Sequence, residues 1–283
     1  MKNEKNMKKK KRVRKAEIAM TVLAVLLIFV FLFPLLWMLL TSFKSAEEIL
    51  RIPPSIFPDS LNLDNYREAL NRQPVFRFIL NSLIVSGVSC AFSILVTAMA
   101  GYGFSKFKFF GKEVMFFLIL SFLIVPFQSI VVPLYKWVVS FGLMDTYTGI
   151  VIPLLVSAFG VFLMRQGIDT IPGALIDAAR IDGCGEFRLF FSIILPNVKA
   201  FIATQAIIKF LWSWNEFYWP MVITNKPHMK VITNGIQAFT SMYYTEYNLI
   251  MAVAVMSILP MALMFAVFQK GVVRAVAMSG MKG

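Results

Sequence analysis

The chain has 283 residues, of which 58% are hydrophobic and 15% are charged, and its mean hydropathy is +0.73. A soluble domain is usually about 45–50% apolar and about 25% charged, so this composition excludes an ordinary water-soluble protein. The net charge of +13 does not indicate a nucleic-acid-binding surface, because residues 1–15 alone carry nine Lys and Arg against one Glu. Two cysteines and one histidine are too few for a disulfide framework or a structural zinc site.

Long apolar segments predict an all-α integral membrane protein. A helix needs roughly 20 apolar residues to cross a bilayer, and five segments of that kind carry no charge. A sixth, 200–223, is as apolar but contains Lys209 and Glu216. We expect a basic tail over 1–17, a six-helix domain over 18–269 and a C-terminal tail over 270–283. The expected spans are 18–41, 78–103, 114–135, 146–164, 200–223 and 247–269.

The distribution of Lys and Arg favours six spans over five. With six, the termini and the loops 106–113 and 165–199 lie on one side and carry 19 basic residues, whereas the other side carries eight. Because basic loops stay in the cytoplasm, we expect both termini to be cytoplasmic in a bacterial cell membrane. The first apolar run has 26 residues, too long for a cleaved signal peptide, which predicts a retained anchor.

Segments outside the spans give further expectations. The basic tail is expected to be disordered. The loop 44–77 is expected outside the cell, with a short helix near 63–70 capped by Asn62 or Asp64. The chain lacks the zinc-protease, nucleophile-elbow and Walker A motifs, so it is expected to act without its own ATPase or peptidase chemistry.

The loop 165–199 carries the most specific pattern in the chain. Thr170 can cap a short helix that begins near Pro172, and Gly183 can end it in left-handed geometry. A second amphipathic helix is expected from Glu186 to about Leu195, where Pro196 would break it. The small pair Ala178 and Ala179 would let another surface approach closely.

This loop resembles the cytoplasmic E-A-A loop of ABC importer permeases. The family pattern E-A-A-x-x-D-G-A, a spacer and I-x-L-P corresponds to Asp177-Ala178-Ala179-Arg180-Ile181-Asp182-Gly183-Cys184 and then Ile193-Ile194-Leu195-Pro196. Asp177 replaces the family Glu, and Cys184 replaces the last Ala.

Further segments are similar to the shorter, second permease of maltose-type carbohydrate importers. They are the A-G-Y-G-F-S-K-F stretch at 100–107, the P-F-Q at 126–128, the P-L-Y at 133–135, the W-N-E-F at 214–217 with W-P at 219–220, and the ending at 268–271 and 281–283. The resemblance implies a MetI-like fold of six helices, type I importer architecture, and a sugar, such as an oligosaccharide, as substrate.

The same resemblance implies an assembly. Its members would be a homologous larger permease, two cytoplasmic ATPase subunits, an extracytoplasmic solute-binding protein and the lipid bilayer, without nucleic acid. This chain would bind no cofactor or metal, because ATP and Mg²⁺ would be used by the ATPase subunits. Docking to those subunits is assigned to the loop residues Asp177, Ala178, Ala179, Arg180, Asp182, Gly183, Glu186, Ile193 and Pro196.

Polar residues in the fifth expected span give a second candidate site. Gln205, Lys209, Ser213 and Glu216 are spaced to share one helical face, with Trp212 and Asn215 alongside. One interpretation is a sugar pathway, in which rings contact the apolar face of a sugar and Asn and Glu bind hydroxyls. The preferred interpretation is helix–helix hydrogen bonding or a neutralising Lys209–Glu216 pair.

Two other functions remain open from the sequence. An ABC permease for amino acids or peptides would share the loop but not the W-N-E-F element or the ending. An ion-coupled carrier or intramembrane enzyme would need paired intramembrane carboxylates or inverted repeats, and neither is seen.

Overall fold

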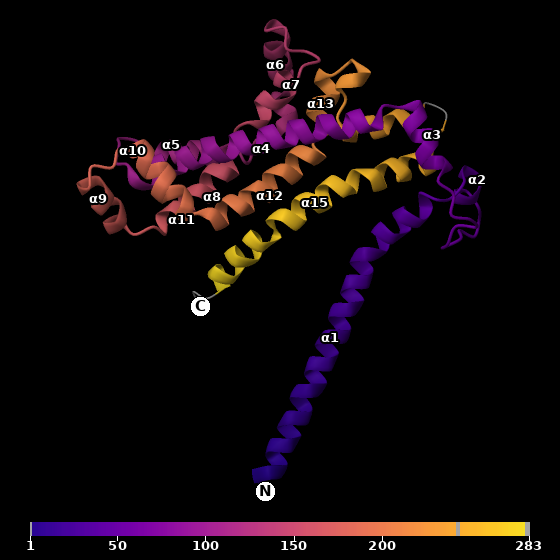
Figure 1. The fold of residues 1–283 in the computed structure, drawn as a ribbon, viewed down its shortest axis with the longest axis horizontal. Coiled ribbons are helices and arrows are strands. Elements are labelled where there is room, and N and C mark those ends of the chain that lie inside the picture. The colour runs from indigo at the N-terminus through magenta and orange to yellow at the C-terminus, as the bar shows by residue number, and fades with distance from the viewer. Residues whose placement is uncertain (1, 242–243, 281–283) are drawn as a thin grey trace. The chain divides into compact units, whose positions relative to one another are not determined.

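The computed structural model describes residues 2–241 and 244–280. Within them the chain is helical, and it forms no strand beyond an isolated bridge between Thr240 and Thr245. The expected all-α architecture is therefore confirmed for the described residues (Figure 1). The last part of the ending compared above, residues 281–283, lies outside the described residues. The chain divides into two units, residues 1–72 with 239–256 and residues 73–238 with 257–283.

The first unit contains α1 (Lys2–Thr41), α2 (Ala46–Ile49), α3 (Asp64–Arg72) and the first turns of α15 (Tyr247–Gly280). The short α3 lies where a helix was expected, and Asn62 Oδ1 accepts a hydrogen bond from the Asp64 amide at 2.8 Å. The preceding loop is fixed by Lys44 Nζ, which donates to the Ser55 carbonyl at 2.5 Å, and by Asn65 Nδ2, which donates to the Ser42 carbonyl at 2.8 Å.

The N-terminal tail differs from the expectation of disorder, because α1 begins at Lys2. Lys and Arg have high helix propensity, and no Gly or Pro interrupts the chain before Pro34. The helix of the first span therefore continues into the basic residues.

The second unit is built around three helices, α4 (Val75–Lys106), α8 (Ala158–Asp169) and α12 (Lys199–Asn215), which lie side by side (Figure 1). Gly101 makes the close approach of α4 and α8 possible. A Cβ added there would lie 2.7 Å from Met164 Cβ and 2.8 Å from the Arg165 amide nitrogen. At that separation only glycine fits between the two backbones.

Shorter helices complete this unit. They are α5 (Lys112–Ser121), α6 (Phe127–Ser140), α7 (Tyr147–Val151), η1 (Ile152–Leu154), α9 (Gly173–Ile181), α10 (Glu186–Leu189), η2 (Phe190–Ile194), α11 (Leu195–Asn197), α13 (Tyr218–Ile223), η3 (Pro227–Met229), α14 (Ile232–Ile236) and η4 (Gln237–Phe239), which extends one residue past the unit. One buried cluster centres on Met164, Ile168 and Leu189, and another on Ile150, Trp219 and Ile223.

Three described helices are long and apolar enough to cross a membrane: Glu17–Thr41, Val75–Lys106 and Tyr247–Val267. The number rises to five if each of two bent pairs is one span, Tyr147–Leu154 with Ala158–Asp169 (51°) and Glu186–Asn197 with Lys199–Asn215 (80°). The count of six spans stays a prediction.

Three expected spans are not continuous helices. The segment 146–164 is interrupted between Leu154 and Ala158, where the chain bends by 51°. The segment 114–135 is interrupted between α5 and α6, because Pro126 lacks an N–H group and disfavours a helical residue before it. The segment 200–223 is interrupted at Glu216, whose ψ of 122° is extended, and the chain resumes as α13.

Candidate functional site

The loop 165–199 forms two helical segments joined by a tight turn at one end of α4. Gly183 has φ of +77°, and its amide donates to the Arg180 carbonyl at 3.0 Å, while the Cys184 amide donates to the Ala179 carbonyl at 2.9 Å. These bonds satisfy carbonyl groups at the end of α9. Gly183 therefore ends this helix in the left-handed geometry that the sequence predicts.

Thr170 does not cap α9, contrary to expectation. Its hydroxyl donates to the Gly167 carbonyl at 2.7 Å, and it occupies the C-cap of α8 instead. The residue before α9 is Pro172, which makes no side-chain capping bond. The carbonyl groups at the end of α8 lack helical partners, so the adjacent hydroxyl is used there.

Pro196 does not end the second helical segment, which is another correction. It lies in the first turn of α11, where a proline is tolerated, and the bend follows at Val198. The turn before it, η2, is a π-helix in which the Leu195 amide donates to the Phe190 carbonyl. The nitrogen of Pro196 cannot donate a hydrogen bond. The π-helical turn lets the residue before it, Leu195, keep its own backbone hydrogen bond. The chain then bends by 80° into α12.

Polar contacts fix the loop to α4. Tyr102 OH donates to Glu186 Oε2 at 2.5 Å, and Arg180 Nε donates to Glu186 Oε1 at 2.8 Å. The Arg180 bond, followed by the Tyr102 bond, holds the pKa of Glu186 below its ordinary value. Lys106 Nζ also donates to the Ile171 carbonyl at 2.7 Å. The Glu186 carboxylate therefore links its own helical segment to α9, through Arg180, and to α4, through Tyr102.

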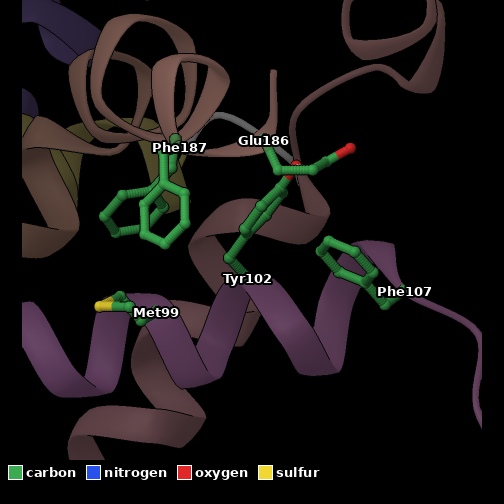
Figure 2. A pocket seen from close by; sticks show the side chains of 6 residues that line it. Met99, Tyr102, Phe107, Glu186 and Phe187 are labelled. Atoms are coloured by element: carbon green, nitrogen blue, oxygen red, sulfur yellow. The ribbon is translucent and has the colours of Figure 1, made fainter. Parts of the chain in front are cut away.

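A pocket of about 160 Å³ adjoins Glu186. It is lined by Met99, Tyr102, Phe107, Glu186, Phe187 and Phe190. Figure 2 shows the Glu186 side chain beside Tyr102, with Met99 and Phe187 on one side of the ring and Phe107 on the other. The Tyr102 and Phe107 rings meet edge to face with centroids 5.2 Å apart. The lining is almost entirely apolar.

The remaining predicted loop residues divide between surface and core. Asp177, Ala178, Asp182, Gly183 and Pro196 are exposed, and Ile193 is partly buried. Ala179 is only 8% exposed and packs into the buried cluster of its own chain. The expectation that both alanines face another surface is therefore wrong for Ala179. One side of α9 packs on the chain's own core and carries Ala179, whereas Ala178 lies on the exposed side.

The structure divides the residues of the fifth expected span between buried and exposed positions. Gln205, Lys209 and Ser213 are buried, whereas Trp212 is 54% exposed and Asn215 donates to the Leu211 carbonyl of its own helix. Gln205 Nε2 donates to Thr97 Oγ1 of α4 at 2.6 Å. For Gln205 the preferred interpretation, helix–helix hydrogen bonding, is confirmed.

Glu216 does not pair with Lys209, and no ion pair within 4.0 Å joins the two in the part of the chain that the structure describes. The Glu216 carboxylate instead accepts a hydrogen bond from the Trp219 amide at 3.1 Å, at the start of α13. The expected pair fails because α12 ends at Asn215, which takes Glu216 off the shared helical face.

Sequence reasoning missed Asn81, which is fully buried at the other end of α4. Its Nδ2 group donates to the carbonyls of His228 and Lys230, both at 2.8 Å, and Tyr147 OH donates to its Oδ1 atom at 2.7 Å. A lone Asn within an apolar span was the available signal. Among the described residues, no group of three or more His, Cys, Asp or Glu could hold a metal ion.

Comparison with known proteins places this geometry in a family. The chain is 34% identical to the arabinooligosaccharides transport system permease protein AraQ of Bacillus subtilis (strain 168), over 94% of this chain and 96% of that protein. It is 31% identical to the sn-glycerol-3-phosphate transport system permease protein UgpE of Brucella abortus (strain 2308), over 89% and 93%.

A solved bacterial ABC transporter involved in the import of the acidic polysaccharide alginate has a chain of the same fold. Its TM-score is 0.78 at 21% identity, over 91% of this chain and 96% of that one. Residues 93–278 match the family described as binding-protein-dependent transport system inner membrane component. The chain belongs to this family of membrane-embedded transport permeases.

Proposed function

We propose that this chain is a membrane-spanning permease subunit of an ABC importer for a carbohydrate. The observation that carries the proposal is the near-full-length similarity to the arabino-oligosaccharide permease, which leaves no large part of either chain unmatched. The similarity to a glycerol-phosphate permease agrees with a small polyhydroxylated substrate. The chain forms half of the pathway and performs no chemistry itself.

The finer parts of the proposal concern its partners and orientation. A homologous larger permease forms the other half, two cytoplasmic ATPase subunits hydrolyse Mg-ATP, and a solute-binding protein delivers the sugar. Six spans place both termini in the cytoplasm, where the 19 basic residues gather. Exposed Asp177, Ala178 and Asp182, on a loop braced by Glu186, support contact between the loop 165–199 and the ATPase subunits.

Transport by the purified complex tests the proposed function. We expect the chain to copurify with an ATPase and a second permease, and proteoliposomes with the binding protein to import arabinotriose or sn-glycerol 3-phosphate only when ATP is supplied. Amino acids serve as the competing substrate class. The proposal is wrong if the complex imports an amino acid but neither arabinotriose nor sn-glycerol 3-phosphate. It is also wrong if an ion gradient drives import without ATP.

Gly183 and Gly185 provide a matched test of the loop. Neither has an atom within 4 Å of an added Cβ, but only Gly183 has a positive φ, since Gly185 has φ of −66°. Gly183→Ala is therefore expected to strain the turn by about 1 kcal/mol, reduce ATPase copurification and lower uptake. Gly185→Ala is expected to behave as wild type. If the two variants show equal uptake and copurify with equal amounts of ATPase, the turn at Gly183 does not couple the chain to the ATPase subunits.

A further inference from the structure

The backbone that connects α9 to α10 is a turn with two glycines, Gly183 and Gly185. The Cys184 amide donates back to the Ala179 carbonyl at 2.9 Å, which ties the first part of the turn to α9. Bending is therefore left to Gly185, where an added Cβ would meet no atom within 4 Å. Because glycine restricts the backbone least, the peptide chain alone does not fix how α9 is oriented relative to α10.

One carboxylate bridges this turn and continues to α4. Arg180 Nε, in the last turn of α9, donates to Glu186 Oε1 at 2.8 Å, and Tyr102 OH donates to Glu186 Oε2 at 2.5 Å (Figure 2). Each oxygen of the carboxylate thus binds a different helix. Hydrogen bonds to an ionised group are about twice as strong as those between neutral groups. We call Arg180, Glu186 and Tyr102 the Glu186 link.

The α4 end of the link is held firmly. Tyr102 is only 6% exposed, and its ring packs against Phe107 and Phe190, with centroids 5.2 and 5.9 Å away. Packing on both sides of the ring restricts its rotamers, so the hydroxyl stays where Glu186 can reach it. The Tyr102 hydroxyl is therefore a fixed point on α4.

Other polar contacts of α4 with the loop stop before α9. Ser105 Oγ donates to Asp169 Oδ1 at 2.5 Å. Lys106 Nζ donates to the Ile171 carbonyl at 2.7 Å. Among the described residues, the Tyr102 bond is the only side-chain hydrogen bond between α4 and the second helical segment, formed by α10, η2 and α11.

We propose that Glu186 is a positioning residue through which movement of α9 reaches α4 during ATP-driven transport. The inference rests on the proposed function, because α9 carries exposed side chains assigned to the ATPase contact. Ile176 and Ala179 hold α9 on the buried cluster, but burial of apolar groups is not directional. A hydrogen bond weakens steeply away from its preferred distance and angle. The Glu186 link therefore supplies a directional connection that the packing of α9 does not.

The number of ATP molecules hydrolysed per arabinotriose imported tests the inference, in proteoliposomes with the complete complex and the solute-binding protein. Tyr102→Phe removes one oxygen and keeps the packed ring. It is expected to raise this ratio about fivefold, because ATP is still hydrolysed but less of the movement reaches α4. Glu186→Leu removes both bonds and is expected to raise it about tenfold. The amount of copurified ATPase is expected to stay at the wild-type level in both.

Glu186→Gln tests rescue by a similar side chain. The amide oxygen can accept from Arg180, and the amide nitrogen can donate to the Tyr102 hydroxyl, so both neighbours keep a partner without the charge. The ratio is expected to rise only about twofold. The double variant with Tyr102→Phe and Glu186→Leu is expected to match Glu186→Leu alone, since Tyr102 acts through Glu186.

Glu113→Leu is the matched control. The Glu113 carboxylate also accepts two hydrogen bonds from a guanidinium, Arg165, at 3.0 and 2.7 Å, but these join α5 to α8. The Glu113 side chain is 57% exposed, similar to 43% for Glu186. This variant is expected to keep the wild-type ratio, even where thermal denaturation shows a loss of stability.

The inference and the proposed function fail in different ways. The inference is wrong if Tyr102→Phe and Glu186→Leu keep the wild-type ratio, or if Glu113→Leu raises it equally. It is also wrong if the effects of Tyr102→Phe and Glu186→Leu multiply in the double variant, or if either variant copurifies with less ATPase, because Glu186 would then act in docking. Absence of ATP-driven uptake of both arabinotriose and sn-glycerol 3-phosphate by wild type would instead overturn the proposed function.

Discussion

Gly101→Ala is expected to lower the free energy of unfolding of the chain in its complex by about 2 kcal/mol, because the new methyl group cannot be accommodated. Its Cβ would lie 2.7–2.9 Å from Met164 Cβ and from backbone atoms of Met164 and Arg165. Backbone atoms cannot rotate aside as a side chain can, so α4 and α8 must separate. Denaturation in mixed micelles measures the change.

Gly103→Ala is the control for this substitution. It lies on the same helix two residues on, where an added Cβ meets nothing within 4 Å. Alanine has the higher helix propensity, so this variant is expected to be more stable than wild type by about 0.5–1 kcal/mol. If the free energy of unfolding falls in Gly101→Ala and rises in Gly103→Ala, separation of α4 from α8 is the cause of the loss. If both variants are less stable, the loss comes from alanine within α4 and not from the contact with α8.

Asn81→Ala is expected to lower the free energy of unfolding by about 3 kcal/mol and to loosen the turn 224–231. The substitution deletes both donors to His228 and Lys230 and the acceptor for Tyr147. Leaving such groups without partners costs roughly 1–3 kcal/mol each, with partial relief from water at the edge of the turn. Thermal denaturation and proteolysis of the turn 224–231 measure the two effects.

Asn197→Ala removes an asparagine bond of the opposite kind. Asn197 Nδ2 donates to the Ile193 carbonyl four residues back on an exposed segment, and water can replace it. A loss of about 0.5 kcal/mol or less is expected. If Asn81→Ala cost no more than this, the three bonds of Asn81 would not be what fixes the turn to α4.

Composition and local backbone rules allowed much of the fold to be predicted. Apolar length identified the helices, and Gly183 was found because a positive φ is a property of one residue and its neighbours. The end of α12 within the W-N-E-F element, in contrast, could not be predicted from the sequence. Residue spacing placed Glu216 on the face of Lys209 only while the helix was assumed to continue, and nothing in the spacing indicates that it stops at Asn215.

Long-range choices between partners were also beyond the sequence. Thr170 had two possible helix ends within reach, and the structure gives its hydroxyl to α8. Ala178 and Ala179 are chemically identical neighbours, yet only the second is buried. The pocket lined by Thr224, Lys230 and Asn234 was not predicted, because its polar residues are spread over 224–237 without a periodic pattern.

The buried serines of α4 and α12 have an energetic consequence. Ser86, Ser89 and Ser93 of α4 and Ser213 of α12 are buried with hydroxyl oxygens that lack partners in the described chain. Two side-chain hydrogen bonds join the helices, from Gln205 to Thr97 and from Cys90 to the Ala206 carbonyl. A buried hydroxyl without a partner costs free energy, so a small movement of either helix that brought a partner within reach of one of these serines would be favoured.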